Sequence, residues 1–267
     1  MSEPLSFLRT PRWVVPAAFA VLLVLAQIGY PLTSGVARDR VTVVVVLLSA
    51  GTALAHAGAT CGVRYAVGFL VIVSGLGLIA EIVGTATGFP FGCYDYADGR
   101  LGPAVAGVPL VVALAWTGGL YPVWVVAGML TRRIAVRIVL TAVGAVGWDL
   151  FLDPQMVADG QWSWCAAGWG LPGLGDIPYT NYLGWFAVAL VMAVLLAGSD
   201  RAVGTRTGFP IPSAVIVPVA VFLWTWLGST LAHAVFLDLP YSAWYGCVGL
   251  GVLGVPLLVR SVLARRS

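Results

Sequence analysis

The sequence predicts an all-α membrane protein, a polytopic bundle of about eight transmembrane helices that forms one domain over residues 1–267. Of the 267 residues, 60% are hydrophobic and only 9% are charged, whereas a soluble domain usually carries roughly a quarter charged residues. Apolar runs of roughly 20 residues, the length that crosses a bilayer, recur along the chain. The regions between these runs are too short to form a separate soluble domain.

The first apolar run follows Arg9 and Arg12 as a signal peptide would, but we expect it to be retained because so much membrane-embedded chain follows it. The second and sixth runs are short for a span. In chain order, the expected helices cover Trp13–Leu32, Val41–Ala57, Tyr65–Gly88, Val105–Leu130, Ile134–Leu152, Tyr182–Gly198, Ile211–Leu237 and Ser242–Val259.

The distribution of arginine predicts the orientation of these helices. With eight spans, the N-terminus, the even-numbered loops and the C-terminus share one side of the membrane. That side holds Arg9, Arg12, Arg64, Arg132, Arg133, Arg137, Arg201, Arg206, Arg260, Arg265 and Arg266, whereas the other side holds only Arg38, Arg40 and Arg100. Positive residues concentrate on the cytoplasmic side. We therefore expect a plasma-membrane protein with both termini in the cytoplasm and loops 89–104 and 153–181 outside.

Composition argues against two other classes of protein. The net charge of +3 is small and spread over the loops, so no nucleic-acid partner is expected. Four cysteines in 267 residues are too few for a disulfide scaffold. Cys93 and Cys165 fall in the two outer loops, and whether they pair depends on a Cα separation that the sequence does not give.

Three carboxyl groups lie at similar depth near the outer ends of the expected helices. Glu81 is near the end of the third helix and Asp149 near the end of the fifth. Asp153 is expected to begin the following loop, because Pro154 disfavours helical geometry in the residue before it. Carboxylates are costly inside a membrane, which favours a functional site over helix-packing hydrogen bonds. His233, at the same depth on the seventh helix, fits either a packing role or a place in the site.

The two outer loops also mix aromatic residues with Asp, Asn, Pro and Gly. Tyr and Trp commonly anchor a protein at the membrane interface, but they can also line a groove and stabilise a cation through their ring faces. Both interpretations stay open. The candidate lining residues are Phe91, Tyr94, Tyr96, Trp148, Trp162, Trp164, Tyr179, Asn181, Trp185 and His233.

The spacing of Asp149 and Asp153 also suggests a metal site. Paired aspartates can hold Mg²⁺ and a diphosphate. Such a site normally needs further carboxylates on another helix and cationic groups for the diphosphate, and the outer side carries few arginines. We therefore expect no metal and no cofactor.

The central third of the chain, residues 81–185, resembles the membrane-integral carotenoid 1′,2′-hydratase family, which includes the bisanhydrobacterioruberin hydratases. The resembling residues are Glu81, Thr87-Gly-Phe-Pro-Phe-Gly92, Tyr94, Tyr96, Leu101-Gly-Pro103, Pro109, Trp148-Asp-Leu-Phe-Leu-Asp-Pro-Gln-Met156, Trp162-Ser-Trp164, Ile177-Pro178 and Asn181-Tyr-Leu-Gly-Trp185. The resemblance implies addition of water to the terminal double bond of an acyclic carotenoid. The substrates would be water and a lycopene-like or elongated C50 carotenoid taken from membrane lipid.

The carboxyl groups suit this chemistry. Protonation of the alkene gives a tertiary cation, which water then captures. A carboxylic acid in an apolar site can stay protonated near neutral pH and act as the acid, and an ionised carboxylate can deprotonate the water. We expect Glu81 to be the acid and Asp149 its partner, with Asp153 admitting water.

Other functions remain open at this stage. A lycopene-type cyclase would use the same protonation but let an internal double bond capture the cation, and a prenyltransferase would require Mg²⁺. A non-catalytic carotenoid-binding or assembly subunit would not need the carboxylates, and a transporter should show an internal repeat, which the halves of the chain lack. Association with other carotenoid-pathway enzymes is expected from pathway logic alone.

Overall fold

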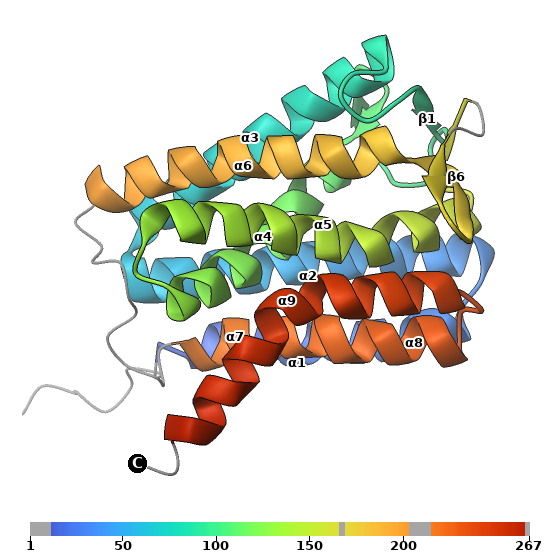
Figure 1. Cartoon of the computed structure of the whole chain (residues 1–267). Coiled ribbons are helices and arrows are strands. Elements are labelled where there is room, and N and C mark those ends of the chain that lie inside the picture. Colours follow the sequence, from blue (N-terminus) through green and yellow to red (C-terminus); the bar gives the residue numbers. More distant parts are fainter. Residues whose placement is uncertain (1–11, 166–168, 203–214, 265–267) are drawn as a thin grey trace, which may run out of the picture.

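The computed structural model describes residues 12–165, 169–202 and 215–264. Within these ranges, eight helical segments are long and apolar enough to cross a membrane. The predictions of an all-α fold and of a multi-pass membrane protein are therefore confirmed. Figure 1 shows the helices lying side by side as a bundle, with short strands gathered at one end. We call the end that carries the strands the loop end.

The helices agree with the expected runs in number and order, and several are longer. They are α1 (Val14–Gly29) with the short 3-10 helix η1 (Tyr30–Leu32), α2 (Gly35–Cys61), α3 (Val63–Thr87), α4 (Leu110–Leu130), α5 (Ile134–Ala158), α6 (Tyr179–Ala202), α7 (Ile216–Leu223), the π-helical segment η3 (Trp224–Gly228), α8 (Ser229–Val235) and α9 (Pro240–Ala264). Together α7, η3 and α8 form the seventh span. Its expected start at Ile211 lies outside the described residues.

The strands bring together the two loops that the sequence singled out. Antiparallel pairs form between β1 (Tyr94–Tyr96) and β4 (Trp162–Trp164), β2 (Ala104–Val105) and β3 (Val108–Pro109), and β5 (Gly170–Leu171) and β6 (Leu174–Pro178). A disulfide joins Cys93, just before β1, to Cys165, just after β4, with the Cα atoms 5.4 Å apart. Residues more than 60 positions apart in sequence are therefore held side by side at the loop end.

One expectation about α5 is wrong. Asp153 does not begin a loop, because α5 continues through Pro154 to Ala158. Proline has no N–H, so the carbonyl of Leu150 loses its usual partner within the helix. The hydroxyl of Ser242, on α9, donates to that carbonyl at 2.7 Å and restores the missing hydrogen bond. Asp149 and Asp153 therefore stay one turn apart on the same face of α5.

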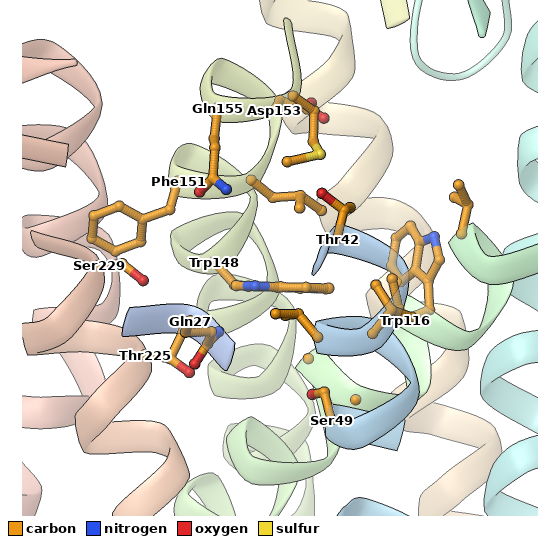
Figure 2. A pocket seen from close by; sticks show the side chains of 18 of the residues that line it. Gln27, Thr42, Ser49, Trp116, Trp148, Phe151, Asp153, Gln155, Thr225 and Ser229 are labelled. Atoms are coloured by element: carbon orange, nitrogen blue, oxygen red, sulfur yellow. The ribbon is translucent and has the colours of Figure 1, made fainter. Parts of the chain in front are cut away.

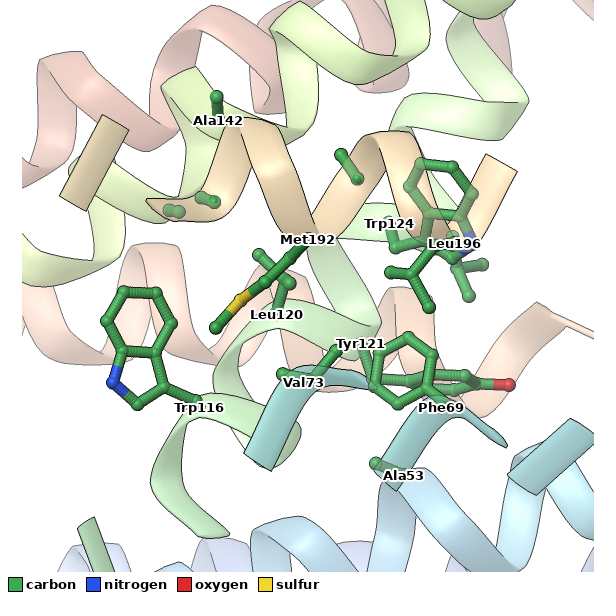
Figure 3. Packing of buried hydrophobic residues seen from close by; sticks show 14 of the residues in the cluster. Ala53, Phe69, Val73, Trp116, Leu120, Tyr121, Trp124, Ala142, Met192 and Leu196 are labelled. Carbon is green, nitrogen blue, oxygen red and sulfur yellow. The ribbon is translucent and has the colours of Figure 1, made fainter. Parts of the chain in front are cut away.

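The core lies around α4, the most deeply buried span. Figure 3 shows side chains of α4, among them Trp116, Tyr121 and Trp124, packed with Phe69 of α3 and Met192 of α6. Small residues let other helices approach α4 closely, and its Gly118 and Gly119 abut side chains of α2 and α5. The central position of α4 places Trp116 beside Glu81 of α3.

Candidate active site

Glu81 is buried on α3 and accepts hydrogen bonds from three side chains. The hydroxyls of Tyr94 and Tyr96 both donate to Oε2, the latter at 2.8 Å. The indole N–H of Trp116 donates to Oε1 at 3.1 Å. The two tyrosines come from β1 and the tryptophan from α4, so the pairing of the loops and the packing of α4 together build this environment.

Both tyrosines are hydrogen-bond donors in this arrangement. Burial raises the pKa of Tyr94 and of Tyr96, and the charge of Glu81 raises the pKa of each further. The phenols therefore stay protonated, and each has one hydrogen to give.

Asp149 and Asp153 form a second acidic group, which Asn181 of α6 holds together. The amide Nδ2 of Asn181 donates to Oδ2 of Asp149 at 2.9 Å and also to Oδ2 of Asp153. The two carboxyl groups lie close together, because both accept from the same amide nitrogen. The other oxygen of Asp149, Oδ1, is buried and has no hydrogen-bond partner among the described residues. The two aspartates thus form a buried pair that shares one donor.

A cavity of about 190 Å³ opens between the helices beside these groups. Glu81, Asp153 and Asn181 reach it. Figure 2 shows the indole of Trp148 lying across the middle of this space, between Gln27 and Thr225 on one side and Trp116 on the other. The cavity therefore presents carboxyl groups to an interior with mostly apolar walls.

Most of the residues expected from the sequence do line this cavity. They are Glu81, Phe91, Tyr94, Tyr96, Trp148, Asp153, Trp162, Trp164, Asn181, Trp185 and His233. Two expected residues do not. Asp149 is fully buried next to Asp153 without reaching the space, and Tyr179, at the start of α6, is 42% exposed.

Aromatic rings form much of the cavity wall. Trp116 and Trp185 are stacked with their ring centroids 3.9 Å apart, and Trp148 meets Trp185 edge-on at 5.5 Å. At the loop end, Tyr96 packs against Trp162 with centroids 5.5 Å apart. Ring faces in such positions attract a positive charge, so the wall suits a cationic intermediate as well as an apolar ligand.

Sequence reasoning missed a set of polar residues that reach the cavity from α1, α2, α5 and the seventh span. They are Gln27, Thr42, Ser49, Gln155, Thr225 and Ser229. The indole of Trp224 donates to Oε1 of Gln27 at 2.8 Å, which links η3 to α1 across the cavity. A glutamine within an apolar span is itself a signal, because polar residues in membrane helices usually face the bundle interior.

His233 of α8 has two neighbours that account for its position. Its Nδ1 lies 2.8 Å from the hydroxyl of Ser242, and its Nε2 lies 3.1 Å from Oε1 of Gln155. The ring also packs edge-on against Phe151, with centroids 5.1 Å apart. His233 thus both borders the cavity and supports the junction of α5, α8 and α9.

Ion pairs join α2 to the loops at the loop end. Arg38 bonds to Asp159 at 2.8 Å, and Arg100 bonds to Asp39 at 2.6 Å. Hydrogen bonds from Arg100 to Asp39 raise the pKa of Arg100. The hydroxyl of Tyr30, which lines the cavity, donates to Asp159 at 2.7 Å. These contacts tie α1 and α2 to the loops next to the site.

Metal ligation has no candidate group within the described ranges. No cluster of three or more His, Cys, Asp or Glu side chains in residues 12–165, 169–202 and 215–264 could hold a metal ion.

The fold and the site together define an integral-membrane protein with an aromatic, carboxyl-bearing cavity between its helices. The family model described as "Carotenoid biosynthesis protein" matches residues 41–253, and the chain belongs to this family. The bisanhydrobacterioruberin hydratase of Haloarcula japonica is 27% identical over 187 residues, which cover 65% of this chain and 61% of the relative. The match thus spans less than two thirds of that relative's length. No solved structure matches the chain.

Proposed function

We propose that the protein is a hydratase that adds water across the terminal 1′,2′ double bond of an acyclic carotenoid. One observation carries the proposal: carboxyl groups from α3 and α5, far apart in sequence, meet at one cavity with aromatic walls inside the membrane spans. Membership of the carotenoid biosynthesis family supplies the class of substrate, and the relative's name supplies the type of reaction.

The chemistry follows from these groups. A carboxylic acid gives a proton to the less substituted carbon of the double bond, which leaves a tertiary cation on the other carbon. The rings of Trp116, Trp148 and Trp185 can stabilise that cation through their faces. Water then attacks the cation, and a carboxylate removes the surplus proton. The product is a tertiary alcohol, and no redox cofactor is required because the substrate is not oxidised overall.

The position of the site suits a substrate dissolved in the bilayer. The carboxyl groups lie near the loop end of the spans, so the end of a long polyene can reach them while its remainder stays in lipid. Water can arrive from the loops, and the new hydroxyl group is left near the membrane surface. We place the loop end outside the cell and both termini in the cytoplasm of a plasma-membrane protein, in line with the arginine distribution.

Pigment analysis tests this proposal. The chain and its Asp153→Asn variant would be expressed in bacteria that accumulate lycopene and in bacteria that accumulate an elongated C50 acyclic carotenoid. We expect a product heavier by one water, more polar and with an unchanged visible spectrum, because the reacting bond lies outside the conjugated system. Loss of a carboxyl group that takes part in proton transfer typically lowers the rate by about 100-fold or more, so Asp153→Asn should form little product.

The control for Asp153→Asn is a variant of an aromatic residue outside the cavity. Tyr179→Phe changes an exposed aromatic residue outside the cavity and should leave conversion intact. An isomeric product with a shifted spectrum would identify a cyclase instead, since only access of water to the cation separates the two reactions. Unchanged pigment with both substrates would reject the hydratase.

A further inference from the structure

The hydrogen bonds around Glu81 favour its ionised form. The indole N–H of Trp116 can only donate, so Oε1 of Glu81 must accept. Tyr94 and Tyr96 both donate to Oε2. A carboxylate accepts all three bonds at once, and hydrogen bonds to the charged form stabilise it. A protonated Glu81 would have to reverse one of the tyrosine bonds.

The surroundings of Asp149 and Asp153 are poorer in donors. The amide of Asn181 gives one hydrogen to each carboxyl group. Oδ1 of Asp149 has no partner among the described residues. Two carboxylates this close in a buried site repel each other, and a single proton held between them removes the repulsion. One amide thus serves two carboxyl groups here, whereas three donors serve Glu81 alone.

From this contrast we infer that the Asp149–Asp153 pair holds the proton that the substrate receives, and that Glu81 acts as a permanent carboxylate. This inference rests on the proposed function for its substrate. Asp153 lines the cavity and is the catalytic acid. Asp149 and Asn181 are positioning residues, because they keep the shared proton on the pair. The inference reverses the roles expected for Glu81 and Asp149 from the sequence.

The two half-reactions balance under this assignment. The O–H bond of Asp153 breaks as the π electrons of the alkene form a C–H bond, which leaves a cation on the neighbouring carbon and two carboxylates in the pair. A lone pair of water then forms the C–O bond. One O–H bond of the attached water breaks, and its proton returns to the pair. The charge of Glu81 stabilises the cation, and three donors on its oxygens make it a poor nucleophile toward that cation.

Infrared spectroscopy of the purified protein without substrate tests the assignment. A protonated carboxyl group has a C=O stretching band that shifts in D₂O, and neither a carboxylate nor an amide absorbs there. We expect this band to be lost in the double variant Asp149→Asn/Asp153→Asn and retained at the same frequency in Glu81→Gln. Loss of the band in Glu81→Gln, or no difference between the wild type and the double variant, would overturn the inference.

A single variant covers the case in which the double variant does not fold. Asp149→Asn removes one member of the pair, so the band must shift or vanish, and an unchanged band would equally overturn the inference. The spectra need no turnover. A protein that gave the expected spectra but formed no hydrated carotenoid would uphold the shared proton and reject the hydratase, so the two failures are distinguishable.

Discussion

At the scale of single residues, Gly119 of α4 shapes the cavity. A Cβ atom at this position would overlap the ring of Trp148, whereas glycine lets the ring lie against the helix. Trp148 in turn meets Trp185 edge-on. A residue with no side chain therefore sets the position of the aromatic wall.

Replacing Gly119 by alanine should push Trp148 into the cavity. Overpacking typically costs about 1–3 kcal/mol, which exceeds the gain of about 1 kcal/mol that alanine brings to a helix interior. We expect a lower thermal midpoint in detergent and less carotenoid conversion. Gly75→Ala is the control, because a Cβ there meets no atom of the described residues within 4 Å. Equal behaviour of the two variants would show that Trp148 is free to move without consequence.

Residue types in the sequence predicted much of the site, but not the roles within it. Carboxylates and aromatic residues are so unusual near the ends of apolar spans that Glu81, Asp153 and Trp148 stood out. What surrounds each carboxyl group depends on segments far along the chain. Trp116, a donor to Glu81, sits in a helix that carries no other sign of the site. The sequence therefore could not decide which acid is ionised.

At the scale of elements, the end of α5 depends on α9. Ser242 donates to the carbonyl that Pro154 leaves without a partner, and the same hydroxyl lies 2.8 Å from Nδ1 of His233. This contact lets α5 carry Asp153 one full turn beyond Asp149. The expectation of a loop at Asp153 was wrong because the bond that sustains the helix comes from a residue 92 positions from Leu150.

Removing the hydroxyl of Ser242 should lower the stability of the folded protein. In Ser242→Ala the carbonyl of Leu150 becomes a buried, unsatisfied acceptor, which costs about 1–3 kcal/mol. We expect a lower midpoint of thermal unfolding in detergent. Ser261→Ala is the control on the same helix, because the hydroxyl of Ser261 donates to Leu257 within α9 and, among the described residues, to no other helix. An unchanged midpoint for Ser242→Ala would show that the break at Pro154 needs no support from α9.

At the scale of the whole molecule, charge is arranged differently at the two ends. At the loop end, Arg38 and Arg100 are paired with Asp159 and Asp39. Among the described residues, the opposite end carries Arg12, Arg64, Arg132, Arg133, Arg137 and Arg260. By this count, positive residues concentrate at the end opposite the loops, which favours insertion with the loop end outward.

Reporter fusions test this orientation. A fluorescent protein fused after residue 267 should be bright, because it folds in the cytoplasm, whereas alkaline phosphatase at the same position should be inactive. As the matched position on the other side, phosphatase inserted at Gly99, whose surroundings are open, should be active. The reverse pattern would place the loop end in the cytoplasm.

The number and order of spans were predictable because the length of an apolar run and the thickness of a bilayer are linked directly. Which helices lie next to each other was not predictable, because lipid-facing and buried positions in such a protein carry the same apolar residue types. The pairing of β1 with β4 and the Cys93–Cys165 disulfide also lay beyond the sequence, because both depend on which loops meet.

The tryptophans of the cavity wall allow ligand binding to be followed by intrinsic fluorescence. Six of the protein's 11 tryptophans border the cavity, namely Trp116, Trp148, Trp162, Trp164, Trp185 and Trp224. A conjugated polyene bound there would lie within energy-transfer range of most of the indole fluorescence. Occupancy of the site can therefore be followed as quenching of the intrinsic emission, independently of whether any bond is made.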